Sequence, residues 1–391
     1  MRLNLFILYS LFGVILYSNR ANAQSDVLNI IPSGGRDAAK LMEAYLAPMG
    51  SGFALATGQN WFNTANSLKL LRFNVQVGAS VVLINSNDKY FDPSTLNLQF
   101  LKPLGNNVNS VPTISAPFGA ESPRWIRYDS IIYPNNEIKY VAIDTISSIL
   151  TGLNLTNAYA PYAQVNLGLI KNTELNIRIA PTLDLATLNG GIIPDNFLKG
   201  KLSYWGLGLK HEVLQWIPVA KLLPISLSLY GNYSRINYAL DVNVEGPSSN
   251  NFPKQLPFNL AVDSFRVVGS TDFSNQKLSI NAESYSYGLV VSKKILMFTP
   301  YASIGIQSSK FGINAEGNYP IRSGYEVIPS RASYTEVWQS QSNPISIETK
   351  ADNVLRMGLG LRVKFVLVSL HAEAFSLGDM RGFSGGLSLG F

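Results

Sequence analysis

The last nine residues of the chain, Phe383–Phe391, read FSGGLSLGF. Phe and Leu fall only at odd-numbered positions of this stretch, whereas Ser and Gly fill every even-numbered position. Successive side chains of a β-strand point to opposite faces, so a period of two predicts a strand with one apolar face and one small, polar face. The C-terminus therefore predicts a strand that separates an apolar environment from a polar one.

The same alternation recurs through most of the chain beyond residue 70. Its clearest segments are residues 72–81, 163–169, 174–184, 278–283, 302–307, 355–362 and 366–374. A soluble β-sandwich also alternates, but here the apolar faces lack charges over about ten residues, the length that a tilted strand needs to cross a bilayer. The opposite faces are rich in Gly, Ser and Asn. We therefore expect an all-β fold, a transmembrane antiparallel up-and-down β-barrel over residues 70–391.

The composition excludes several other classes of protein. Of the 391 residues 46% are hydrophobic and only 14% are charged, against about 25% charged residues in a typical soluble domain. The chain has no Cys and two His, which excludes disulfides and thiolate sites and leaves little for a metal cluster. The formal charge of +6 falls to +4 without Arg2 and Arg20 and does not indicate a nucleic-acid surface. We expect no metal, no cofactor and no nucleic-acid partner.

The N-terminus has the layout of a secretory signal peptide. Arg2 precedes an apolar run from Leu5 to Leu16, and Ala21-Asn22-Ala23 follows as an A-x-A cleavage site. A retained membrane anchor is the alternative, but the apolar run is short for a bilayer span. We expect residues 1–23 to be removed and the mature chain to reach the bacterial outer membrane.

The connections between the alternating segments differ strongly in length. If the strand near residues 71–84 runs outward, short turns such as Ile170–Thr173 and Lys364–Phe365 lie on one side. The long excursions at residues 86–157, 241–275 and 317–346 then lie on the other side. Outer-membrane barrels have short periplasmic turns and longer external loops. The clear spans number about ten. Further pairs within the long excursions, such as Trp125–Ile131 with Ile138–Ile143, raise the expected even total to about 12–14.

Residues 24–69 precede the first clear strand and predict a plug or periplasmic cap. A short helix is expected over Asp37–Pro48, with Pro48 ending it. A polar and aromatic run follows, in which Trp61, Phe62 and Asn63 are the candidate plug residues. The alternative is a packed leader with no role in gating.

Several charged or titratable residues share the polar face of their strands and are expected to face the lumen. They are Arg72, Arg178, Glu283, Arg356, Arg362, His371 and Glu373. The near balance of charge favours pairing of these Arg with acidic residues over an anion-selective pore. Ser369, His371 and Glu373 also lie two residues apart on one strand, but a catalytic triad normally draws on separate elements. We expect no catalytic residues and no enzyme.

Trp216 lies in the amphipathic segment His211–Pro224 and is expected at the level of the lipid headgroups. A helix that docks a partner protein is the alternative for this segment.

Several stretches carry a resemblance to a known family: Ala44–Gly50, Asn60–Ala65, Gly206–Glu212 with Gln215–Pro218, and the terminal Phe391. The chain resembles an uncharacterised family of outer-membrane barrels found largely in Bacteroidota. More weakly, it resembles the FadL/TodX-type (OmpP1-like) transporters of hydrophobic compounds, whose N-terminal hatch has Asn-Pro-Ala where this chain has Asn63-Thr64-Ala65. The resemblance implies that Phe391 belongs to the signal read by the barrel-assembly machinery.

These observations favour a passive channel for small hydrophobic or amphipathic compounds, gated by an N-terminal plug. Its expected partners are outer-membrane lipid, the barrel-assembly machinery and hydrophobic small molecules. A non-transporting barrel whose surface loops serve adhesion or assembly is the alternative, and an outer-membrane hydrolase is a third option.

Overall fold

The computed structural model describes residues 23–105, 108–146, 150–184, 200–217, 224–247, 261–331 and 333–390. Residues 1–22, which contain almost all of the expected signal peptide, and Phe391 lie outside the described residues. No helix in the described ranges is both long enough and apolar enough to cross a membrane.

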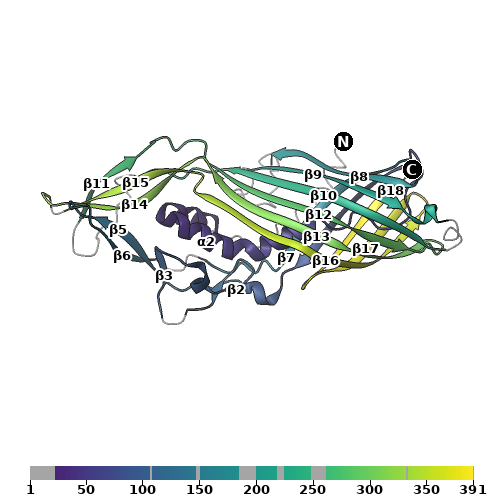
Figure 1. The fold of residues 1–391 in the computed structure, drawn as a ribbon, viewed down its shortest axis with the longest axis horizontal. Helices are drawn as coiled ribbons and strands as arrows, with labels where there is room; N and C mark the ends of the chain where they lie inside the picture. Colours follow the sequence, from purple (N-terminus) through teal and green to yellow (C-terminus); the bar gives the residue numbers. More distant parts are fainter. Residues whose placement is uncertain are drawn as a thin grey trace.

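Ten antiparallel strands form a closed barrel in the order β1-β18-β17-β16-β13-β12-β10-β9-β8-β7 (Figure 1). They are β1 (Phe73–Leu83), β7 (Asn157–Gly168), β8 (Thr173–Asp184), β9 (Gly200–Glu212), β10 (Ser226–Asp241), β12 (Lys277–Ser292), β13 (Phe298–Glu316), β16 (Ile345–Phe365), β17 (Val368–Leu377) and β18 (Met380–Gly390). The first and last strands pair and close the wall, with Val75 opposite Leu389. The expected up-and-down antiparallel barrel is confirmed.

The expected total of about 12–14 wall strands was too high. The remaining strands build a six-stranded sheet, with β6 pairing β5 beside the order β11-β15-β14-β5-β3, and a separate β2-β4 pair. They are β2 (Tyr90–Phe91), β3 (Leu101–Pro103), β4 (Val111–Pro112), β5 (Trp125–Ile132), β6 (Ile138–Ile146), β11 (Ala261–Val268), β14 (Asn318–Ile328) and β15 (Ser333–Ser342), with short 3₁₀ turns η1 (Ser86–Lys89), η2 (Pro93–Leu96) and η4 (Leu214–Trp216). Strands β13 and β16 are 19 and 21 residues long, about twice a membrane crossing. They leave the barrel before the β14–β15 hairpin begins, so the extra strands form an extension at one end.

The two ends of the barrel carry different connections. The turns after β7, β12 and β16 are short and meet at one end, which we call the short-turn end. The connections from β1 to β7, from β10 to β12 and from β13 to β16 are long and lie at the other end, where they build the extension. This separation confirms the expectation from connection length.

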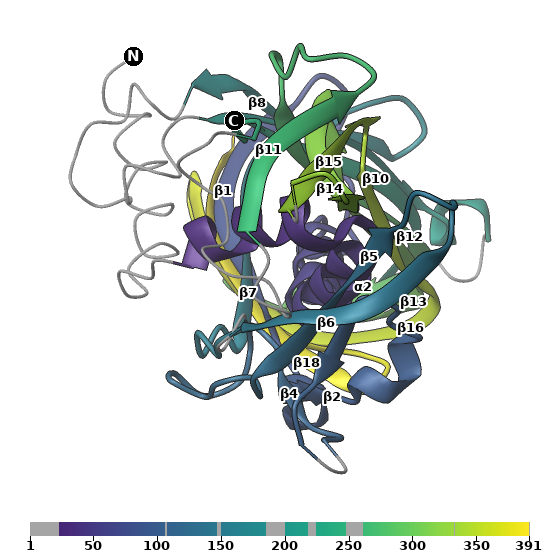
Figure 2. The same ribbon diagram turned by 90° about the vertical axis from the view of Figure 1, so that its left-hand side faces the viewer.

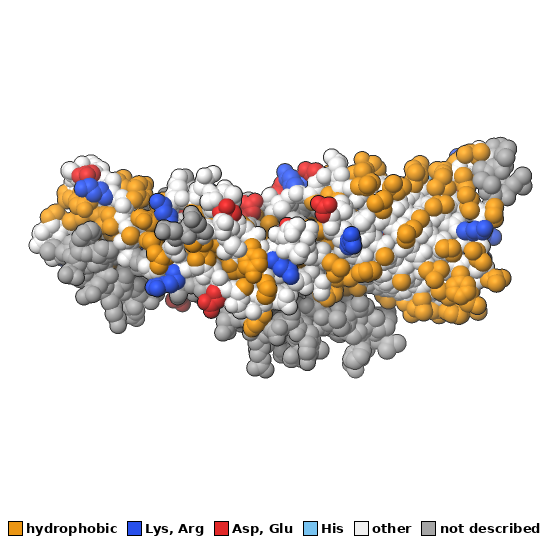
Figure 3. All heavy atoms as spheres, turned by 90° about the horizontal axis from the view of Figure 1, so that it is seen from below, with side chains coloured by type: hydrophobic (Ala, Val, Ile, Leu, Met, Phe, Trp, Pro, Cys, Tyr) orange, Lys and Arg blue, Asp and Glu red, His pale blue; other side chains and the backbone are white. Residues whose placement is uncertain are grey.

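A row of charged side chains crosses the outer face of four neighbouring strands. Arg235 of β10 lies opposite Glu283 of β12, which lies opposite Lys310 of β13 and then Lys350 of β16. On the short-turn side of this row the outward residues are apolar, and Tyr233 and Tyr285 lie directly beside it. Between this row and the short turn that follows β12, the strand has about nine residues, which is enough to cross a bilayer. Figure 3 shows the apolar side chains gathered over this part of the barrel.

The apolar face of the strands changes sides at this charged row. On the short-turn side of the row, inward residues of β13 such as Ser303 and Gln307 are small or polar, and Ile304 faces outward. On the extension side, Phe311 and Ile313 are buried inside. The inside of the extension is a core and its outside meets water, so the alternation inverts. Glu283 of β12 lies at this inversion and faces outward, so its prediction as a lumen residue was wrong.

The extension encloses the N-terminal helix α2 (Ala23–Thr57). Viewed from the extension end, the helix lies within a ring of strands (Figure 2). Leu41 and Tyr45 pack against Trp125, and Leu55 packs against Val82 of the barrel wall. Burial raises the pKa of Tyr45, and its hydroxyl donates to the carbonyl of Thr151 at 2.8 Å.

The helix is longer than the expected Asp37–Pro48, and Pro48 does not end it. A proline inside a helix costs about 3 kcal/mol, but α2 is packed on several sides by separate apolar clusters. Burial of a single Leu returns about 1.5–3 kcal/mol. Tertiary packing therefore outweighs the local helix-breaking signal.

Asp37 fastens the helix to the extension. Its buried carboxylate accepts backbone N–H groups from Gln99, Phe100 and Leu101 at 2.5–3.1 Å. We expect Asp37→Asn to lower the free energy of unfolding by about 1–2 kcal/mol, because the amide keeps one acceptor and loses the charge. Glu43→Gln, on an exposed position of the same helix, is the matched control. Equal thermal unfolding midpoints for the two variants would contradict this account.

Candidate functional site

The barrel lumen is filled by residues 58–68, which we call the plug segment. It follows the end of α2, and residues 69–72 connect it to the start of β1. Trp61, Phe62 and Asn63 are 3%, 9% and 7% exposed, which places all three candidate plug residues inside. Trp61 and Phe62 pack with Tyr230 and Tyr301 of the wall.

Hydrogen bonds reach the plug segment from most of the surrounding wall. Its contacts include Asn63 with Gln76 of β1 and His371 of β17, Trp61 O with Gln164 of β7, Ala65 O with Ser228 of β10, Ala65 N with Ser292 of β12, and Gln59 with Gln307 of β13. Three buried cations, Arg178, Lys210 and Arg356, complete the set. The plug is therefore held by the inward faces of many strands at once.

Arg178 of β8 binds the beginning of the plug segment. Its guanidinium donates to the carbonyl of Thr57 at 3.1 Å and to that of Gln59 at 2.8 Å. The same group lies 3.9 Å from the ring centre of Trp61 and 4.2 Å from that of Tyr162. Arg178 is 1% exposed, so carbonyl oxygens and aromatic faces replace water around its charge.

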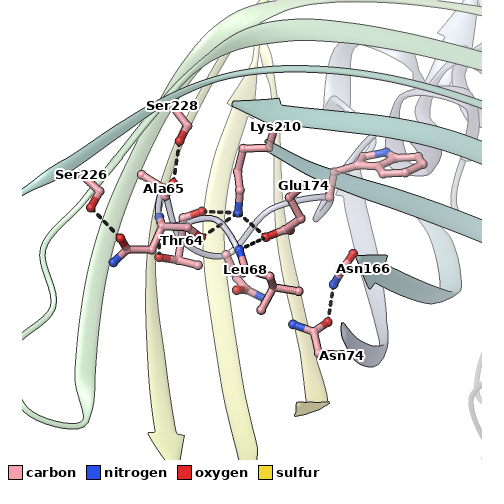
Figure 4. A network of polar contacts seen from close by, with 12 residues as sticks. Thr64, Ala65, Leu68, Asn74, Asn166, Glu174, Lys210, Ser226 and Ser228 are labelled. Atoms are coloured by element: carbon pink, nitrogen blue, oxygen red, sulfur yellow. Dashed lines mark hydrogen bonds and ion pairs between the residues drawn. The ribbon is translucent and has the colours of Figure 1, made fainter. Parts of the chain in front are cut away.

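Lys210 of β9 binds the other end of the plug segment (Figure 4). Its ammonium donates to the carbonyls of Thr64 and Asn66 at 3.0 and 3.1 Å. Glu174 of β8 pairs with it at 3.3 Å and also accepts the backbone N–H of Leu68 at 3.0 Å. One ion pair thus fixes three points of the plug backbone.

Arg356 of β16 connects the plug to β17. It donates to Gln59 Oε1 at 2.7 Å and to Glu373 at 2.6 Å. His371 lies 3.2 Å from the hydroxyl of Tyr162, and Ser369 bonds Ser388 at 2.6 Å. Ser369, His371 and Glu373 therefore each have separate partners.

Two glycines of β9 make room for the plug. A Cβ at Gly206 would lie 2.9 Å from the Trp61 ring, and one at Gly208 would lie 2.8 Å from it. Sequence reasoning missed Lys210 as a plug contact. The alternation of β9 contained the signal, since it places Lys210 on the same face as Gly206 and Gly208.

The other expected site residues differ in their placement. Arg72 is exposed at the short-turn end. Arg362 is half-buried and lies within electrostatic reach of Glu174 and Tyr301, which contact the plug segment. Glu283 pairs with Arg235 at 3.4 Å on the outer face. Trp216 is 59% exposed, and its indole N–H donates to His211 at 2.8 Å.

A small cavity remains beside the plug segment. Its volume is about 10 Å³, and Asn60, Trp61, Asn232 and Arg356 are among its lining residues. The buried amide of Asn60 and the indole N–H of Trp61 have no hydrogen-bond partner among the described residues. A cavity of this size holds about one water molecule. The plug segment therefore packs closely against the wall around this cavity.

In the described part of the wall, β7 and β8 meet along a short seam. Among the described residues these strands pair over only five positions, from Gln164 opposite Arg178 to Gly168 opposite Glu174. On its other side β7 pairs with β1 along eleven positions. Pro161 lies in the part of β7 that does not pair with β8, and Pro181 lies where the register of β8 with β9 shifts. Proline has no N–H to donate, so it is found at strand edges and bulges.

Comparisons with solved structures give only remote similarity. The translocator domain of the autotransporter NalP from Neisseria meningitidis matches with 9% identity and a TM-score of 0.26, covering 90% of this chain and 98% of that one. A Pseudomonas aeruginosa FadL homologue matches with 10% identity and a TM-score of 0.23, covering 88% and 97%. Ail, the attachment invasion locus protein of Yersinia pestis, matches with 12% identity and a TM-score of 0.22, covering 49% and 82%.

No curated protein matches the sequence. One family matches it along residues 1–391. The chain therefore belongs to the family of unknown function DUF6588.

Proposed function

We propose that this protein is an outer-membrane β-barrel that passes small hydrophobic or amphipathic compounds, with the plug segment as its gate. The band of outward apolar side chains between the charged row and the short turns supports a membrane location. A closed barrel gives each wall strand a neighbour on both sides, as a bilayer favours.

The observation that carries the proposal is the short seam between β7 and β8. The plug segment lies in the lumen, and among the described residues the part of β7 from Asn157 to Ala163 pairs with β1 but not with β8. Behind it lies an apolar cluster of Tyr162, Tyr204 and Ile236, with Phe53 of α2 packed against it. An apolar compound gains by moving from such a cluster directly into lipid. The seam therefore supports a lateral exit through the wall.

A disulfide across the seam tests this exit. Extending the register beyond Gln164 and Arg178 brings Ala163 opposite Ile179, and both face outward. We expect oxidised Ala163→Cys/Ile179→Cys protein in liposomes to take up the hydrophobic fluorophore N-phenyl-1-naphthylamine several-fold more slowly than wild type, and reduction to restore the rate.

The matched control is Val165→Cys/Ile177→Cys, because these outward residues are already paired. The native chain has no Cys, so each variant contains a single possible disulfide. Equal uptake by the two oxidised variants would show that the compound does not leave through the seam.

The size of the extension favours a second function, a surface platform for adhesion or assembly. Its edge strand β6 presents Ile138 and Tyr140, which are 55% and 65% exposed. If neither wild type nor a variant with a released plug takes up the fluorophore, this second function becomes the better one.

A further inference from the structure

The turns at the short-turn end carry apolar residues at their tips. Leu71, Leu296 and Val366 are 77%, 87% and 88% exposed. Tight turns are normally built from Gly, Asn, Asp or Ser, whose chemistry suits both the turn and water. Aliphatic tips are therefore poorly matched to an aqueous environment.

The same three residues adopt a left-handed backbone. Their φ angles are +62° for Leu71, +53° for Leu296 and +34° for Val366. This conformation is strained for aliphatic residues and most of all for a β-branched one. The left-handed backbone disfavours these side chains, and so does contact with water. An apolar environment around the tips would account for their presence.

Basic side chains lie between the apolar tips. We call Lys69, Arg72, Lys171, Lys293, Lys294 and Lys364 the basic rim, and all six are exposed. Lys364 lies within electrostatic reach of Lys294 and Arg72. In the described part of the chain no carboxylate forms an ion pair with the rim: Glu174 is buried against Lys210, and Glu212 is half-buried at the same end. The rim therefore has an excess of positive charge.

The tips and the rim continue the apolar band of the barrel without a break. Phe73, Phe298 and Phe365, at the ends of their strands, are 44%, 45% and 52% exposed. Trp216 lies at the same end, with Lys171 positioned 5.6 Å from its ring centre. Aromatic and basic residues side by side are typical of the boundary between acyl chains and headgroups.

We propose that the basic rim binds the anionic headgroups of phospholipids in the leaflet at the short-turn end, with Leu71, Leu296 and Val366 inserted at the acyl boundary. This inference rests on the proposed membrane location and adds a lipid class and a site to it. Positive charge on the rim attracts the lipid phosphates, and the apolar tips hold the short-turn end against the bilayer.

Lipid selection by the full-length protein tests the rim. The protein is inserted into vesicles with equal phosphatidylglycerol and phosphatidylcholine, extracted gently, and its bound lipids are counted by native mass spectrometry. We expect a several-fold enrichment of phosphatidylglycerol on wild type. The triple variant Lys293→Gln/Lys294→Gln/Lys364→Gln should return to the bulk ratio.

The matched control removes the same charge from the other end, as Lys102→Gln/Lys139→Gln/Lys277→Gln, and should keep the enrichment. If wild type inserts and resists urea but shows no enrichment of phosphatidylglycerol, lipid binding by the basic rim is overturned. The proposed membrane location of the barrel is then unaffected. Failure of wild type to insert would overturn both the rim and the proposed function.

A second measurement follows the turn tip itself. A fluorophore on Leu296→Cys should be quenched by lipids with a nitroxide near the headgroup, whereas one on Asn135→Cys, in the β5–β6 turn, should not. Equal, weak quenching at both positions would show that the tips face water or another protein.

Discussion

Arg178→Met should open the barrel. The guanidinium holds the carbonyls of Thr57 and Gln59 and stacks on Trp61. Hydrogen bonds from a charged donor are worth roughly 1.5–3 kcal/mol each, and Met fills the volume without donating. Because both carbonyls stay buried only while the plug is in place, the loss acts on the closed state. We expect the population of open barrels to rise on the order of a hundredfold, measured as single-channel conductance in planar bilayers.

Arg235→Met is the matched control for this experiment. Arg235 also lies on a wall strand, but it is 41% exposed on the outer face and pairs with Glu283. Such a pair contributes less than about 1 kcal/mol. Its conductance should equal that of wild type. A closed Arg178→Met barrel would show that the plug does not depend on this cation.

The alternation in the sequence predicts most of the barrel. This works because the side of the strand to which a side chain points depends only on its position along that strand. Inward Arg178 and Arg356 and outward Leu359 follow directly from a period of two. Glu283 shows where the rule ends. It lies in the charged row, and the inside changes from a polar lumen to an apolar core at that level.

The strand number and the length of α2 depend on partners far away in the sequence. Local patterns around Trp125 and Ile138 predict strands, and strands form there, but they pair with β14 and with each other outside the wall. Likewise, Pro48 predicts a helix end, and only the surrounding clusters carry the helix past it. A short stretch of sequence does not determine which strands pair with each other or which apolar clusters surround a helix.

Gly208→Val changes a residue of the barrel wall and no residue of the plug segment. We expect it to displace the plug segment. A Cβ at this position would lie 2.8 Å from the Trp61 ring, closer than real side chains approach, and Trp61 is 3% exposed and packed against Tyr230 and Tyr301. Valine suits a β-strand, so the wall itself should still form. In an Asn63→Cys background we expect maleimide labelling to be faster by on the order of tenfold or more.

Gly231→Val is the control, because it adds the same side chain to the neighbouring strand β10, where the nearest atom to a new Cβ is 3.9 Å away. Asn63 is 7% exposed, so the cysteine should stay protected in this control as in the unmodified wall. Slow labelling in both variants would mean that the wall yields to the Trp61 ring and the plug stays in place. Fast labelling in Gly208→Val alone would separate the plug from the barrel that holds it, because only the contact between Trp61 and β9 has changed.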